Sequence, residues 1–187
     1  MKKSLLISLY LFVCFFMNCE NSVDTRNGSN EDLIQNSSFE IDGNPSINGW
    51  TFKTSYFPID TLFTYFSNDV PPSGGKWSVF LPVGDRLVSY LQKRIAAPVG
   101  KNRYRLSVWA KAYLSIPSGG SSGFVSLALN TTNIKSIAGA DTTWQYYESI
   151  DTITANKGDT ITVTLSSGTA YRSRSSYFDL CRLELLK

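Results

Sequence analysis

Apolar and polar side chains alternate along several stretches of the chain. Ile161, Val163 and Leu165 are separated by threonines, and residues 104–110 repeat the pattern with Tyr, Leu, Val and Ala on one side. A period of two residues places the apolar set on one face of a β-strand and the polar set on the other. The pattern therefore predicts antiparallel sheets that pack one face on a core and expose the other.

Strands of this kind recur at short intervals, with clusters of Gly, Pro, Asn and Asp between them. We expect strands near 33–39, 50–57, 61–67, 77–82, 86–96, 103–114, 123–130, 144–153, 159–166 and 176–186. This spacing predicts an all-β fold, a two-sheet antiparallel β-sandwich or jelly roll, formed by one domain over residues 32–187. A domain of that length buries roughly two thirds of the surface of its unfolded chain.

The N-terminus follows a different pattern. Lys2 and Lys3 precede an apolar run from Leu5 to Met17, which has the length of a signal-peptide hydrophobic region and is too short to cross a bilayer comfortably. Cys19 follows the run, so residues 1–18 resemble a bacterial lipoprotein signal with Cys19 as the lipidated residue. Asn18 stands where such signals usually have a small residue, and a plain secretion signal or an uncleaved anchor are the alternatives.

Residues 19–31 are polar and have too few apolar side chains to build a core, so we expect a flexible tether. A lipid at one end of the tether and a folded domain at the other predict an exported protein. We expect it to be attached to the bacterial outer membrane, on the periplasmic or the surface face.

Composition excludes several classes of function. The chain has 18 Lys and Arg against 15 Asp and Glu, and removal of Lys2 and Lys3 leaves 16 against 15, a net charge of +1. No long basic run stands out, so a nucleic-acid partner is not expected. The absence of histidine excludes Ser-His-Asp and Cys-His mechanisms and histidine-ligated catalytic zinc. Cys14 lies within the signal, and Cys181 lies in an apolar strand, where we expect it as a small buried residue.

Candidate ligand contacts lie on the polar side of the predicted strands. Trp109 falls on that side of the 103–114 strand, with Arg105 and Lys111 flanking it on the same face. Such a face suits a sugar, because the apolar faces of a pyranose stack on aromatic rings while its hydroxyls need hydrogen-bond partners. Tyr90 would share a face with Gln92 if its strand has no bulge. The alternative is that these charged side chains are solvated surface residues.

Six short motifs follow one another in order along the domain. They are Asn36-Ser-Ser-Phe-Glu40 with Gly49-Trp50, Gly74-Gly75-Lys76-Trp77-Ser78-Val79, Leu91-Gln92, Tyr104 to Lys111, Trp144-Gln-Tyr-Tyr147 and Tyr177-Phe-Asp179. This order resembles the galactose-binding-like jelly rolls, especially the carbohydrate-binding modules found beside cellulases and xylanases. The resemblance covers nearly all of 32–187 and implies a β-sandwich, a structural calcium and often a sugar site.

The resemblance also implies roles for individual residues. Glu40 and Asp179 would bind the calcium, with backbone carbonyls of the 40–50 loop completing its oxygen ligands. Leu180 stands where a second Asp often follows, and the alternative is that both acids cap backbone amides or pair with Arg182. Trp77 follows a Gly-Gly turn, where related modules often carry a binding aromatic residue.

Other aromatic residues are expected mainly in the fold. Trp50 and Trp144 are assigned to the core, and the pairs Tyr56-Phe57 and Tyr65-Phe66 place one ring on each face of a strand. Tyr171 lies in a late polar loop, as a possible contact at the rim.

The sequence thus predicts a non-catalytic, lipid-anchored carbohydrate-binding protein that holds glycans at the bacterial envelope. The expected ligand contacts are Trp77, Trp109, Tyr90, Arg105 and Lys111. Its expected partners are a glycan, the membrane through the N-terminal lipid, and neighbouring uptake or hydrolase proteins of the envelope. The alternative is a structural or protein-interaction lipoprotein on the same fold with no sugar site.

Overall fold

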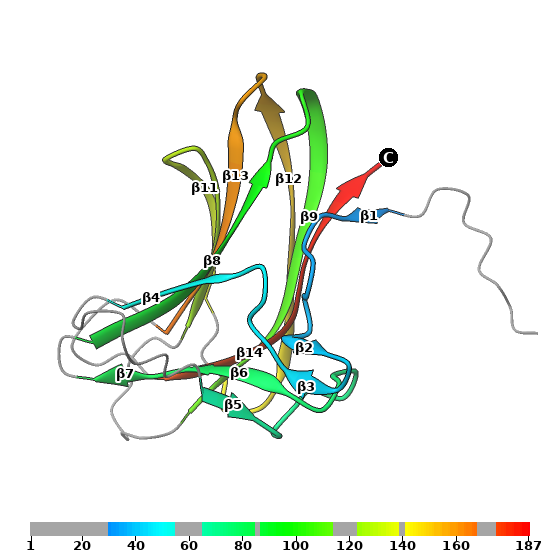
Figure 1. The fold of residues 1–187 in the computed structure, drawn as a ribbon. Helices are drawn as coiled ribbons and strands as arrows, with labels where there is room; N and C mark the ends of the chain where they lie inside the picture. The colour runs from blue at the N-terminus through cyan, green and yellow to red at the C-terminus, as the bar shows by residue number, and fades with distance from the viewer. Residues whose placement is uncertain (1–29, 55–64, 85–86, 114–122, 139–140, 168–174) are drawn as a thin grey trace, which may run out of the picture.

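Two antiparallel sheets packed face to face form the domain, as the computed structural model in Figure 1 shows. The structure describes residues 30–54, 65–84, 87–113, 123–138, 141–167 and 175–187. The predicted signal, Cys19, most of the tether, Tyr56-Phe57 and Tyr171 lie outside these residues. No helix long and apolar enough to cross a membrane occurs in the described parts of the chain.

The first sheet has the strand order β12-β9-β14-β6-β5, and β1 pairs with β14. Its strands are β1 (Glu31–Asp32), β5 (Tyr65–Ser67), β6 (Ser78–Leu81), β9 (Gly100–Ala112), β12 (Gln145–Ala155) and β14 (Ser176–Leu186). β9 and β12 pair along eleven residues, from Gln145 opposite Ala110 to Ala155 opposite Gly100. This long pairing aligns the outward-pointing side chains of β9 with those of β12, including Trp109 with Tyr146.

The second sheet has the strand order β11-β10-β13-β8-β4, and β7 pairs with β8. Its strands are β4 (Thr51–Thr54), β7 (Val83–Gly84), β8 (Leu87–Ala96), β10 (Phe124–Leu129), β11 (Thr132–Ala138) and β13 (Thr160–Ser166). A small hairpin of β2 (Glu40–Ile41) and β3 (Asn44–Pro45) stands apart from both sheets. The all-β antiparallel sandwich predicted from the alternation is confirmed.

The core lies between the sheets and uses the apolar positions that the alternation marked. Leu106 and Val108 of β9 belong to one buried cluster with Val163 and Leu165 of β13, and each of the four is fully shielded from solvent. Burying such a side chain contributes roughly 1.5–3 kcal/mol each. Trp50 belongs to the same cluster, as predicted.

The two ends of the domain lie side by side. β1 pairs with the end of β14, with Asp32 opposite Glu184, and the amide of Cys181 donates to the carbonyl of Ser37 at 2.9 Å. The blue and red ends of the ribbon accordingly run together in Figure 1. Cys181 is fully buried, as expected, and burial raises the pKa of its thiol.

The predicted strand over 33–39 is wrong. Asn36 and Phe39 adopt left-handed backbone conformations, with φ of 57° and 55°, so the chain turns where an extended strand was expected. The turn is stabilised because the Trp50 indole donates to the carbonyl of Asn36 at 3.1 Å and the Phe39 ring lies 5.3 Å from that of Trp50. β11 was also missed, since its polar sequence around Asn133 gives a weak strand signal.

Candidate functional site

A β-bulge in β14 shapes the outer face of the first sheet. Asp179 lies opposite Trp109 and Arg182 lies opposite Ser107, so β14 uses one residue more than β9 over this stretch. Leu180 takes up the extra residue with a φ of 48°. Because of the bulge, Asp179 and Arg182 both lie on the side of the sheet away from the core, where Asp179 is nevertheless buried, while Cys181 and Leu183 belong to the core.

Trp109 and Tyr146 form an aromatic pair on this outer face. They lie opposite each other on β9 and β12, and their ring centroids are 5.6 Å apart at an angle of 56°. Trp109 is half-buried, whereas Tyr146 is 48 % exposed. The Tyr146 hydroxyl donates to the Glu148 carboxylate at 3.2 Å. Solvent therefore reaches an aromatic surface next to a polar rim.

The pair borders a hollow of about 330 Å³, which we call the Trp109 hollow. Its lining residues are Ser73, Arg105, Ser107, Trp109, Tyr146, Leu180, Arg182 and Glu184. Ser107 is buried and short, so it forms a low point between longer side chains on the neighbouring strands. At the far end, Arg105 Nε lies 2.9 Å from Glu184 Oε2, with the two side chains 32 % and 21 % exposed. Aromatic surface and hydrogen-bonding groups of both signs thus meet in one concave site.

Lys111 belongs to a separate cluster on the same face. Its ammonium forms an ion pair with Asp69 and lies 5.0 Å from the Tyr177 ring centroid and 5.7 Å from that of Trp144. The Trp144 indole donates to Asp69 at 2.8 Å. Trp144 is therefore half-exposed in a polar contact, not in the core as predicted.

Burial alone would raise the pKa of Asp69, but the hydrogen bonds from Lys111 and Trp144 outweigh it and lower that pKa. Lys111 is thus already engaged by a carboxylate and two aromatic rings. Among the described residues it does not line the Trp109 hollow.

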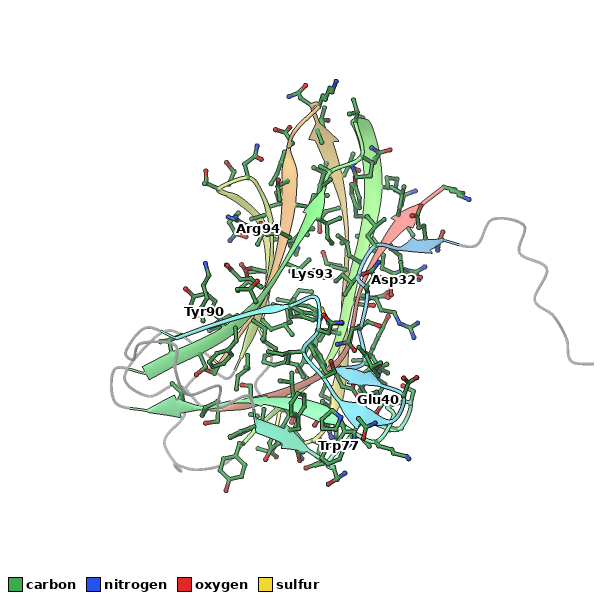
Figure 2. All side chains as sticks on the ribbon, viewed as in Figure 1. Asp32, Glu40, Trp77, Tyr90, Lys93 and Arg94 are labelled. Atoms are coloured by element: carbon green, nitrogen blue, oxygen red, sulfur yellow. The ribbon has the colours of Figure 1, made fainter. Side chains whose placement is uncertain are left out.

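Tyr90 and Trp77 lie in two other places. Tyr90 is on β8, and its neighbours across the strands are Lys53 and Ser166, so it faces outward from the second sheet. Figure 2 shows Tyr90 and Arg94 on one side of β8. The Trp77 indole donates to the carbonyl of Gly43 at 3.1 Å, which holds it against the turn of the β2-β3 hairpin. The five predicted ligand contacts therefore do not converge, and only Trp109 and Arg105 share a hollow.

Glu40 and Asp179 lie close together, as the resemblance implied. A Cβ atom added to Gly74 would clash with the carboxylate of Asp179, and one added to Gly75 would clash with that of Glu40. The two glycines therefore make room for the two acids. Each acid accepts one backbone hydrogen bond, Glu40 from Lys76 at 2.8 Å and Asp179 from Leu180 at 2.7 Å. The alternative of amide capping is thus realised for one oxygen of each acid.

The second oxygen of Asp179 is left unsatisfied. Oδ2 is buried with no hydrogen-bond partner, and the residue is fully shielded from solvent. Desolvation, together with the nearby Glu40 charge, raises the pKa of Asp179 to about 7. Two adjacent carboxylates with a free buried oxygen fit a hard cation such as calcium, which prefers oxygen ligands. No third carboxylate or other His, Cys, Asp or Glu joins the pair within the described ranges, so carbonyl oxygens would supply the remaining ligands.

Sequence reasoning missed several residues of the hollow. Tyr146 could have been found, since it follows Trp144 in a strand of period two and therefore shares a face with Glu148. Arg182 and Glu184 could not be assigned to that face, because the bulge reverses the alternation in β14. Outside the hollow, Asp69 could not be identified as the partner of Lys111, because it lies in a loop without any periodic signal.

Known proteins resemble this chain in structure. Neither a family profile nor a curated protein matches the sequence. A family 61 carbohydrate-binding module in complex with β-1,4-galactotriose is similar, with 17 % identity, a TM-score of 0.55, and coverage of 82 % of this chain and 97 % of that one. A family 22 xylan-binding domain from Paenibacillus barcinonensis has 12 % identity and a TM-score of 0.58, over 85 % of this chain and 97 % of the other.

An enzyme domain is also similar. The enzymatically active domain of tailspike protein 4 of bacteriophage CBA120 has 15 % identity and a TM-score of 0.62, and the match covers 83 % of this chain. The aligned region is only 21 % of the tailspike chain. These similarities establish the jelly-roll fold that carbohydrate-binding modules have, and they leave the activity to be argued from the site.

Proposed function

We propose that this protein is a non-catalytic glycan-binding protein and that the Trp109 hollow is its binding site. The observation that carries the proposal is the Trp109–Tyr146 pair, with Trp109 half-buried and Tyr146 exposed, beside hydrogen-bonding side chains in one concavity. A pyranose stacked on these rings would place its hydroxyls near Arg105, Glu184 and Ser107, which offer donors and acceptors. The similar galactotriose-binding and xylan-binding modules support the same class of ligand.

The stacking contribution can be estimated. If a sugar covers roughly 80 Å² of aromatic surface, burial at ~25 cal/mol per Å² gives about 2 kcal/mol. That is about a 30-fold effect on the dissociation constant. A single site of this kind is weak, so we propose that the protein retains glycans by avidity with many copies on one envelope, near uptake or hydrolase proteins.

We further propose a structural calcium at Glu40 and Asp179. The support is the unsatisfied Oδ2 of Asp179 beside a second carboxylate. Calcium would neutralise the two charges and join the β2-β3 hairpin to β14, the two chain ends that already lie together. It would have no part in the chemistry of a reaction.

The membrane attachment stays a proposal from the sequence. We propose that Cys19 is lipidated and that the domain hangs from the outer membrane on the 19–31 tether. The test is mass spectrometry of the N-terminal peptide from the native host, compared with a Cys19→Ala variant. A Cys19 peptide without lipid in the native protein would refute the anchor.

The binding site is tested in two steps. A glycan array first identifies the glycans that the purified protein binds, and calorimetric titration with these glycans then measures their affinities. Trp109→Ala and Tyr146→Ala are the test variants, and Tyr90→Ala on the second sheet is the matched control. The estimate above covers both rings together, so we expect each single variant to lose about 1 kcal/mol, roughly fivefold in affinity, and the double variant to lose about 30-fold, while the control keeps its affinity. Loss with Tyr90→Ala and not with Trp109→Ala would move the site to the second sheet. No binding to any glycan would favour the structural or protein-interaction alternative.

A further inference from the structure

The charges around the Trp109 hollow are unequal. Arg105 and Arg182 line it together with one carboxylate, Glu184. Glu184 is committed to Arg105, since Arg105 Nε lies 2.9 Å from its Oε2. Glu148, the next carboxylate on this face, is on the far side of Ser107 and accepts the Tyr146 hydroxyl. The lining therefore carries one positive charge in excess, at Arg182.

Arg182 has no ion pair with any carboxylate of the described residues. Its charge acts on Asp32 at a distance, but the Asp32 carboxylate accepts the amides of Ile34 and Leu183 instead. The residue is exposed, so its guanidinium is accessible to a ligand. A guanidinium in this state can bind a ligand anion without first breaking an internal ion pair.

The sheet places Arg182 at a suitable distance from the aromatic pair. Arg182 lies directly across from Ser107, and Trp109 is two residues along the same strand. Diagonal neighbours of this kind are about 7–8 Å apart at their Cα atoms, which long side chains can span. Ser107, the residue across from Arg182, is short and buried, so its side chain leaves this part of the hollow open.

From these observations we propose that the Trp109 hollow selects acidic glycans, with Arg182 binding the carboxylate of a uronic acid residue whose ring stacks on Trp109 and Tyr146. The inference rests on the proposed function. A guanidinium presents two parallel N–H groups in a plane, which match the two oxygens of a planar carboxylate. Neutral sugars would use the same stacking surface and lack this bidentate contact.

The test compares two ligands that differ only at C6 of each sugar, where one has a carboxylate and the other a neutral hydroxymethyl group. Oligogalacturonate and the same oligosaccharide after chemical reduction of its carboxyl groups are titrated into the full domain by calorimetry, at low and at high salt. We expect the acidic form to bind at least about tenfold more tightly, a difference of 1.4 kcal/mol. We also expect high salt to remove most of this preference.

Variants separate the role of Arg182 from general charge. Arg182→Gln should abolish the preference, so that the variant binds the acidic and the reduced oligosaccharide with equal affinity, while Arg94→Gln, on the outer face of the second sheet, should leave the preference as it is in the wild type. Equal affinity for the two ligands in the wild type, or a preference that survives Arg182→Gln, would overturn the inference while the proposed function stands. Failure of both ligands, with other glycans also unbound, would remove the proposed function as well.

Discussion

Replacing Asp179 by Asn tests the acidic pair most directly. In the folded chain the pKa of Asp179 is raised from 3.8 to about 7 by desolvation and by the nearby Glu40 charge. Asn has the same shape, keeps an oxygen to accept the amide of Leu180, and carries no charge. The variant therefore removes the titration and retains the hydrogen bond.

The magnitude follows from proton linkage. A shift of about three units at 1.36 kcal/mol per unit makes metal-free protein roughly 4 kcal/mol less stable once the group is ionised. The sign is set by the raised folded pKa. From about pH 4 to pH 7 the unfolded chain loses this proton first, so the free energy of unfolding falls as pH rises. Above pH 7 the loss from this group is complete.

The assay is urea denaturation in chelator from pH 4 to pH 8, for the wild type and Asp179→Asn. We expect the variant to be more stable than the wild type by several kcal/mol at pH 8 and equal to it near pH 4. Calcium at 100 times its dissociation constant should add about 2.7 kcal/mol to the wild type at pH 8 and little to the variant.

Two results would refute this reasoning. Parallel pH profiles for the two proteins in chelator would mean that Asp179 is not the strained group we describe. A calcium effect of the same size in both proteins would place the cation elsewhere.

Three further predictions concern other parts of the domain. Gly75→Ala should displace the Glu40 carboxylate and cost about 1–3 kcal/mol of stability in denaturation, since the carboxylate would lose its amide donor; unchanged stability would contradict the close packing. Lys111→Met should raise the pKa of Asp69 in carboxyl NMR titrations, because the variant loses the ion pair. The lowered pKa of Asp69 stabilises the folded wild type at pH values above the unfolded pKa, and this stabilisation is lost as pH falls. The variant should lack it and should therefore be ~0.5–1 kcal/mol less stable at neutral pH after solvent screening. An unshifted titration would refute the pairing. Cys181 should react with a thiol reagent only after unfolding, because it is fully buried and its pKa is raised; rapid labelling of folded protein would show that β14 opens.

The fold could be predicted because burial follows a period of two residues. Leu106 and Val108, or Ile161 and Val163, lie in the core because a strand with one face on another sheet must have that pattern. The segment before Phe39 could not be predicted from the pattern, since left-handed conformations there depend on hydrogen bonds to residues around Trp50. Local propensity gives way to tertiary contacts at such turns.

The candidate site was predicted only in part, for a similar reason. The alternation of β9 correctly placed Trp109 and Arg105 on one outer face. It could not show that Lys111, on the same face, is paired with Asp69, because that acid comes from a loop 42 residues earlier in the chain. Nor could it show that Tyr90 belongs to the other sheet's face, since strand order depends on long-range pairing.

The single extra residue at Leu180 has a consequence for comparisons between this chain and its structural relatives. A sequence that lacks the insertion would keep its Phe-Asp pair in place, but every later side chain of that strand would change sides. An alignment drawn without a gap there would match outward positions with inward ones, and Arg182 would be compared with a core residue. A search for relatives that share the Arg182 guanidinium should therefore allow one gap between Asp179 and Arg182. It should also score the parts of the strand before and after that gap separately.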